Sequence, residues 1–77
     1  MSARDYANQS REQMLRLAAR LGATVRVDRD AYAPALFAVW ITVDADGTED
    51  IVAAADVEVE AIDAAVETMQ RWLEVAS

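Results

Sequence analysis

The sequence has no cysteine, no histidine and no lysine, and its 77 residues include only two glycines and one proline. Without cysteine, disulfides, thiolate nucleophiles and cysteine-based metal sites are excluded. Without histidine, the commonest general base and metal ligand is missing. All seven basic side chains are arginines, whose planar guanidinium groups favour paired hydrogen bonds to carboxylate or phosphate. We therefore expect a cytoplasmic protein without redox chemistry.

Long apolar runs are also absent. The longest, Ala35 to Ile41, is too short to cross a bilayer, and residues 1–10 are polar, so we expect neither membrane insertion nor secretion. Apolar residues nevertheless make up 55% of the chain, which predicts a folded protein. A chain of this length forms one domain, residues 1–77, with a single core.

Charge of the two signs is divided along the chain. Residues 1–29 contain six arginines and three acids, whereas residues 30–77 contain eleven acids and one arginine, and the net charge is -7. Such an excess repels nucleic acid and anionic membrane and attracts basic surfaces of other proteins. The pattern predicts a partner with a basic surface, while a purely solubilising role for the acids is the simpler interpretation.

The first periodic segment predicts an amphipathic helix over residues 5–21. The apolar positions at helical spacing are Met14, Leu17, Ala18 and Leu21. Ser10 and Gln13 can form a capping box, although good helix formers from Ala3 onward can extend the helix upstream. Gly22 is expected to end it.

Alternation of apolar residues predicts three strands, over residues 23–29, 35–43 and 48–54. The side chains expected to face the core are Val25, Val27, Phe37, Val39, Ile41 and Val43. Residues 44–47 are predicted to form a hairpin turn in which Gly47 can take a positive φ. The alanines of the third segment suit a helix equally well.

A second helix is predicted over residues 57–75, with Asp56 as its N-cap. The positions of its single apolar stripe are Val59, Ile62, Val66, Met69 and Leu73. Glu67 is placed to pair with Arg71 one turn later.

These elements predict an α+β fold of αβββα order, in which both helices pack on one face of a three-stranded antiparallel sheet. The other face would stay open to solvent and expose Leu36 and Trp40. An exposed tryptophan is a suitable anchor for a partner.

Catalytic and metal-binding patterns are weak. The turn at residues 44–47 has some features of a calcium loop, but Ala53 occupies the position of the bidentate glutamate. Serines have no histidine partner, and no glycine-rich phosphate loop is present. We therefore expect no enzymatic activity, cofactor or metal. The arginines of the first helix are expected to pair with Glu12 and with acids of the second helix instead of contacting nucleic acid.

Across residues 8–75, the order of elements and Pro34 in the first strand connection resemble the double-stranded RNA-binding domain. That family uses a lysine cluster at the start of its last helix to bind phosphate. The corresponding residues here are Asp56-Val57-Glu58-Val59-Glu60, so the charge is inverted and the resemblance does not imply RNA binding.

In size, acidity and lack of catalytic residues, the whole chain resembles the small phage-encoded anti-CRISPR proteins that act on type I surveillance complexes. This resemblance implies a stoichiometric inhibitor that occupies a basic DNA-binding surface in the bacterial host cytoplasm. It is carried by general properties and not by a motif.

We therefore predict a non-catalytic protein-binding inhibitor whose acidic surface blocks a basic nucleic-acid-binding surface, most specifically the DNA-binding groove of a type I CRISPR effector. The predicted partner-binding residues are Trp40, Asp44, Asp46, Glu49, Asp50, Glu58, Glu60, Asp63 and Glu67. The alternatives are an interaction or dimerisation module that docks through the open sheet face, and an antitoxin-like regulator. A monomer is slightly favoured over a homodimer.

Overall fold

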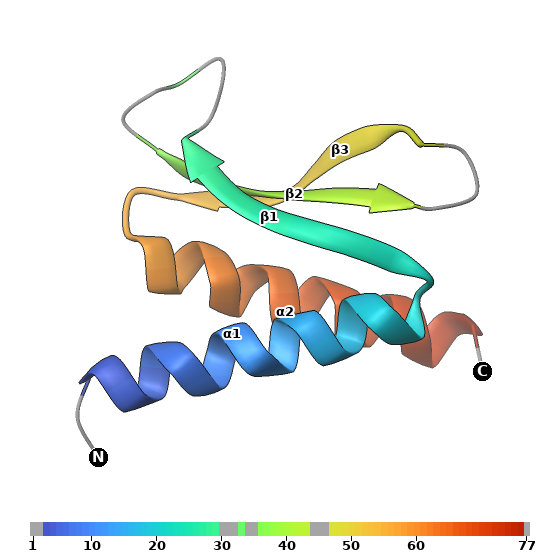
Figure 1. Cartoon of the computed structure of the whole chain (residues 1–77), viewed down its shortest axis with the longest axis horizontal. Coiled ribbons are helices and arrows are strands. Elements are labelled where there is room, and N and C mark those ends of the chain that lie inside the picture. Colours follow the sequence, from blue (N-terminus) through green and yellow to red (C-terminus); the bar gives the residue numbers. More distant parts are fainter. Residues whose placement is uncertain (1–2, 30–32, 34–35, 44–46, 77) are drawn as a thin grey trace.

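The computed structural model describes residues 3–29, 33, 36–43 and 47–76. Its elements are α1 (Ala3–Arg20), β1 (Ala23–Arg29), β2 (Phe37–Val43), β3 (Glu49–Ala55) and α2 (Glu58–Ala76) (Figure 1). The predicted α+β fold and αβββα order are confirmed. The third segment is a strand in spite of its alanines, and each predicted boundary lies within two residues of the observed one.

Helix α1 begins upstream of the predicted capping box. Ser10 lies inside the helix and is 7% exposed, so the prediction that it starts the helix is wrong. The extension from Ala3 onward is the alternative that holds, because this segment contains good helix formers and neither glycine nor proline. At the other end, Gly22 takes a φ of 67° and its N–H donates to the carbonyl of Ala19 at 3.1 Å, as the glycine after a helix commonly does.

The three strands form an antiparallel sheet in the order β1-β2-β3. The pairing of β2 with β3 shifts between two neighbouring residues: Val39 lies opposite Ala53, but Trp40 lies opposite Ile51. Val52 is thus the extra residue of a β-bulge. Because of it, Val52 and Ala53 both pack against the core, which strict alternation along a strand would not allow.

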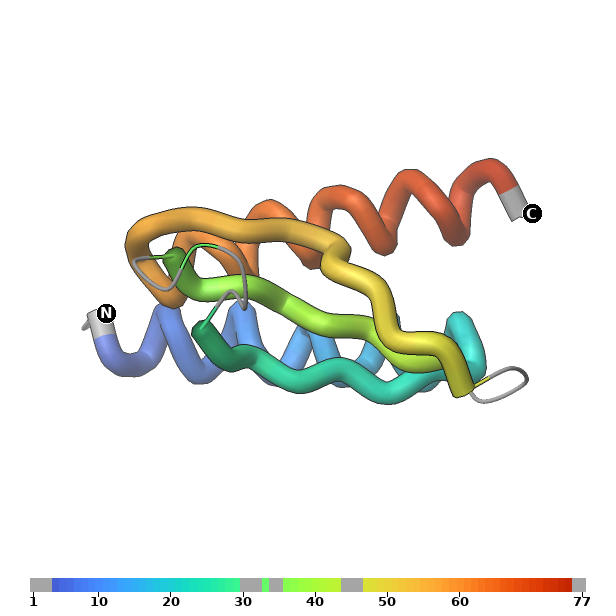
Figure 2. Tube along the Cα trace, turned by 90° about the horizontal axis from the view of Figure 1, so that it is seen from above, coloured from blue at the N-terminus to red at the C-terminus, as the bar shows by residue number. Residues whose placement is uncertain are grey.

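Both helices cover the same face of the sheet, and they run in the same direction (Figures 1 and 2). Their amino-terminal ends lie at the end of the molecule where β3 connects to α2. Their carboxyl-terminal ends lie at the end of the molecule where β2 ends and β3 begins. This arrangement gives the molecule two distinct ends.

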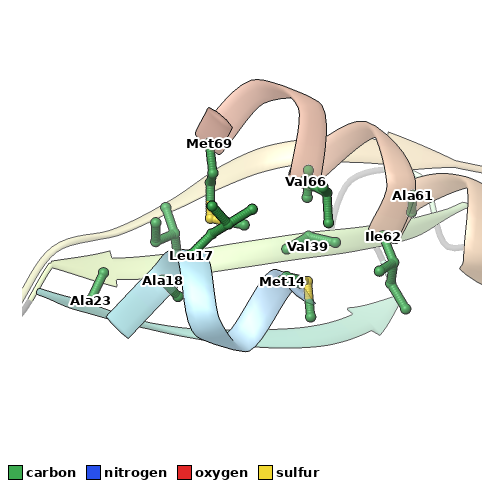
Figure 3. Close-up of a cluster of buried hydrophobic side chains, with 11 residues drawn as sticks. Met14, Leu17, Ala18, Ala23, Val39, Ala61, Ile62, Val66 and Met69 are labelled. Carbon is green, nitrogen blue, oxygen red and sulfur yellow. The ribbon is translucent and has the colours of Figure 1, made fainter. Parts of the chain in front are cut away.

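The core lies between the helix pair and the sheet (Figure 3). The fully buried large side chains are Met14, Ile62, Met69 and Val39. Apart from one residue, the side chains predicted to face the core from the strands lie in it or pack against it. Val43 is the exception, being 40% exposed, because it is the last residue of β2 and lies next to the turn. None of the described helices is long and apolar enough to cross a membrane.

Candidate functional site

Three of the predicted partner-binding acids lie on one side of α2. Glu60, Asp63 and Glu67 follow one another at steps of three and four residues, which places them on neighbouring turns. Glu60 and Glu67 are exposed, and neither forms an ion pair within the part of the chain that the structure describes. We call these three residues the α2 acidic row.

Asp63 is the least accessible member of the α2 acidic row. It is half-buried and accepts a hydrogen bond of 2.8 Å from the hydroxyl of Tyr6 on α1. This hydrogen bond raises the pKa of Tyr6 above its usual value, and the Asp63 charge adds to the effect, while a hydrogen bond from Ser10 opposes it. One oxygen of Asp63 is thus already engaged within the protein.

Glu58, in the first turn of α2, is engaged as well. Arg11 of α1 donates a hydrogen bond to its carboxylate, and the two side chains are 46% and 44% exposed. Exposed pairs of this kind contribute little to stability. The pair does, however, neutralise one of the acids that we predicted to face a partner.

The predicted acids of the hairpin divide in a similar way. Glu49 binds Arg26 through two hydrogen bonds, Nε to Oε2 at 2.8 Å and Nη2 to Oε1 at 2.9 Å. These bonds lower the pKa of Glu49, and they raise the pKa of Arg26. Asp50 is exposed. Asp44 and Asp46 lie outside the described residues.

The two groups of acids do not share one face of the molecule. Glu49 and Asp50 open β3 and follow the turn at one end of the sheet, whereas Glu58 and Glu60 open α2 at the opposite end (Figure 1). A flat partner cannot contact both groups at once without wrapping around the molecule. The structure therefore brings together the α2 acidic row and separates it from the hairpin acids.

Trp40 is not the exposed anchor that we predicted. Both Trp40 and Leu36 are half-buried, and the Arg26 guanidinium lies over the indole, with its Cζ 4.9 Å from the ring centroid. The indole Nε1 is buried and has no hydrogen-bond partner among the described residues. The prediction of exposure failed because the register places Arg26 directly opposite Trp40, and the long arginine side chain folds over the ring.

Two depressions lie between the two helices and share Gln13 and Gln70 in their linings, and we call them together the interhelical furrow. Its larger part, of about 660 Å³, is lined by Gln13, Arg16, Leu17, Arg20, Gln70, Leu73 and Glu74. Its smaller part, of about 340 Å³, is lined by Tyr6, Gln9, Ser10, Gln13, Asp63, Val66, Glu67 and Gln70. All of these lining residues lie on α1 or α2 and none on a strand, so the furrow belongs to the helix layer.

Among the described residues, some arginines of α1 form an ion pair with an acid of α2, and others do not. Arg11 binds an acid of α2, as predicted. Arg16 and Arg20 line the furrow, and neither forms an ion pair in the described part of the chain. Glu67 likewise forms no ion pair with Arg71 there, so the predicted pair within α2 is not formed.

Sequence reasoning did not identify Tyr6, Gln13, Gln70 or Arg26 as members of a site. Arg26 did give a signal, since the predicted alternation places it on the open face of the sheet together with Trp40. The other three give no such signal. They become neighbours only through the parallel arrangement of the helices, which the sequence does not specify.

Comparisons with known proteins add no relationship: protein-family models, curated proteins and solved structures each give no match. Within residues 3–29, 33, 36–43 and 47–76, no group of three or more acidic, cysteine or histidine side chains is placed to hold a metal ion. The arrangement offers exposed carboxylates and guanidinium groups on one layer of helices. Groups of these two kinds can form ion pairs.

Proposed function

We propose that this protein is a non-catalytic inhibitor that binds another protein and occupies a basic, nucleic-acid-binding surface of it. The contact is made by the α2 acidic row. The single observation that carries the proposal is the pair Glu60 and Glu67, two exposed carboxylates on one side of a helix without an ion pair among the described residues.

The spacing of this pair suits a basic surface. Glu67 follows Glu60 by seven positions, which corresponds to about 10 Å along a helix. Their side chains stand on a helix that is fixed to the core through Ile62 and Met69, so the two charges keep their separation. Fixed carboxylates of this kind meet arginine or lysine side chains that otherwise bind phosphate, and the resulting contacts accelerate encounter.

Internal ion pairs make two of the other predicted acids secondary contacts. Glu58 and Glu49 already bind Arg11 and Arg26, so a partner must compete with these arginines to reach them. Trp40 lies beneath Arg26 and therefore has no direct role in our proposal.

The specific target that we propose is the DNA-binding groove of a type I CRISPR effector. Support for this target comes from the resemblance of the chain to type I anti-CRISPR proteins in size and in its net charge of -7. The test is capture of a purified type I effector by the protein at low and moderate salt, with target DNA as competitor. We expect binding that target DNA prevents and that weakens with salt, because exposed ion pairs are screened.

Two double variants with the same change in charge distinguish the contribution of the α2 acidic row to binding from that of the total negative charge. Glu60→Gln with Glu67→Gln should reduce capture of the effector at least tenfold. Glu12→Gln with Glu74→Gln removes the same charge from α1 and from the last turns of α2, and it should leave capture nearly unchanged. Equal losses in the two double variants would show that total charge, and not the α2 acidic row, controls binding. No capture at any salt would remove this effector as the target.

A further inference from the structure

The interhelical furrow carries opposite charges at its two ends. Arg16 and Arg20 line the end near the carboxyl termini of the helices, and Asp63 and Glu67 line the other. Gln13 and Gln70 line both parts and so mark the point where the two parts meet. Glu74 lowers the positive charge of the arginine end without cancelling both guanidinium groups.

The charges of the furrow match those of a second copy only if the two copies are related by one particular symmetry axis. Two copies that stack furrow to furrow can be related by a two-fold axis along the helices or by one across them. An axis along the helices places the arginine end of one copy on the arginine end of the other. An axis across the helices reverses the direction of the second copy, and each arginine end then faces an acidic end.

We infer that a second copy of this chain occupies the furrow, related to the first by a two-fold axis that crosses the helices near Gln13 and Gln70. In this arrangement α1 of each copy lies over α1 of the other. The long side chains of Arg16 and Arg20 then reach diagonally to Asp63 and Glu67 on α2 of the other copy, which forms two equivalent sets of ion pairs. The glutamines near the axis meet their own counterparts, and an amide can do so because it both donates and accepts hydrogen bonds.

The dimer is weak and exchanges rapidly. Exposed ion pairs contribute little each, and two copies of net charge -7 repel one another. The furrow also has only a narrow apolar floor, formed by Leu17, Val66 and Leu73. Self-association therefore requires concentrated protein and enough salt to screen the repulsion of the whole molecules.

Self-association also has a consequence for partner binding. The dimer covers Asp63 and Glu67, two of the three members of the α2 acidic row, so a basic partner competes with the second copy for them. The existence of the dimer does not depend on the proposed function, because it follows from the charges of this chain alone. The dimer would be an inactive form of the protein, and its dissociation would release monomer that can bind the partner.

The test is sedimentation equilibrium of the purified protein, without any partner, over a wide range of concentration at moderate salt. We expect the wild-type chain to shift from monomer toward dimer as concentration rises. The variant Arg16→Glu with Arg20→Glu makes both ends of the furrow acidic, and Asp63→Arg with Glu67→Arg makes both ends basic. Each variant alone should lose the dimer, because like charges then face each other.

An equimolar mixture of the two variants is the decisive sample, because its furrows are again complementary and should form a heterodimer. General attraction does not explain such a result, since both variants keep a net negative charge. Circular dichroism verifies that each variant is folded. The inference is overturned if the wild type stays monomeric at the highest attainable concentration, if either variant still dimerises, or if the mixture stays monomeric. None of these outcomes affects the capture experiment with the effector, so the two proposals fail separately.

Discussion

Arg26 reaches across the open face of the sheet to Glu49, joining the edge strands β1 and β3 over the central strand β2. Two hydrogen bonds of 2.8 and 2.9 Å link the side chains, and a third bond of 3.1 Å joins Arg26 to Asp28. Trp40 lies beneath the guanidinium, whose Cζ is 4.9 Å from the ring centroid. The arginine thus shields the one tryptophan of the sheet from water and uses an acid that would otherwise be free for a partner.

Removal of Arg26 should expose Trp40. In a Trp72→Phe background, which leaves Trp40 as the sole tryptophan, Arg26→Ala should move the fluorescence emission to longer wavelength and increase quenching by acrylamide. Arg20→Ala, on the helix layer, is the matched control and should leave the emission unchanged. An unshifted spectrum in the Arg26 variant would show that other groups cover the ring.

The Arg26–Glu49 pair predicts a dependence of stability on pH. The pKa of Glu49 is lowered in the folded protein by the hydrogen bonds from Arg26. A lowered folded-state pKa contributes stability above the unfolded-state pKa, about 4.3, and this contribution is lost as pH falls through the folded-state value. Urea unfolding from pH 7 to pH 3 should therefore show Glu49→Gln less stable than wild type at pH 7, with the difference becoming smaller as the pH falls.

Glu12→Gln serves as the control for this titration. Glu12 forms no ion pair with a described residue, so its replacement removes one negative charge without breaking such a pair. A difference between Glu49→Gln and wild type that stays constant from pH 7 to pH 3 would contradict the assignment of the effect to ionisation of Glu49.

Truncation of Met69 should destabilise the protein strongly. Its side chain is fully buried between α2 and the rest of the core (Figure 3). Met69→Ala leaves a cavity and should cost about 2–5 kcal/mol of unfolding free energy, a large share of what so small a domain has. Met69→Leu keeps the volume and should cost less than about 1.5 kcal/mol. Urea denaturation followed by circular dichroism measures both, and similar losses would place Met69 outside a tightly packed core.

Replacement of Gly22 tests backbone conformation separately from packing. Its φ is +67° and a Cβ built on it meets no atom within 4 Å, so any cost of Gly22→Ala comes from the left-handed backbone and not from a clash. That conformation costs about 1–2 kcal/mol for a residue with a Cβ. Thermal unfolding should show Gly22→Ala less stable than wild type, with Gly22→Asn between them, since asparagine tolerates this region better. An alanine variant as stable as wild type would contradict the observed geometry.

Much of the fold was predictable because its signals are local. Leu17 and Met69 lie on helical stripes, Val39 and Ile41 alternate along a strand, and Gly22 and Gly47 both take the positive φ that a helix end and a turn require. Ser10 and Asp56 were less reliable guides to helix starts. A long run of helix formers precedes Ser10, and α2 begins at Glu58 with the carbonyl of Val57 accepting its first helical hydrogen bond, at 3.1 Å.

The candidate site was predictable only as a set of residue types. By itself, the sequence determined that the second half of the chain is acidic, that α2 carries acids away from its apolar stripe, and that every basic group is an arginine. The tertiary structure decided which of these charges are free. It placed Arg11 beside Glu58 and Arg26 beside Glu49, left Glu60 and Glu67 without ion pairs among the described residues, and formed the furrow between the two helices. Charge and periodicity are properties of neighbours along the chain, whereas pairing depends on the direction of the helices and the register of the strands, which only packing of the whole domain fixes.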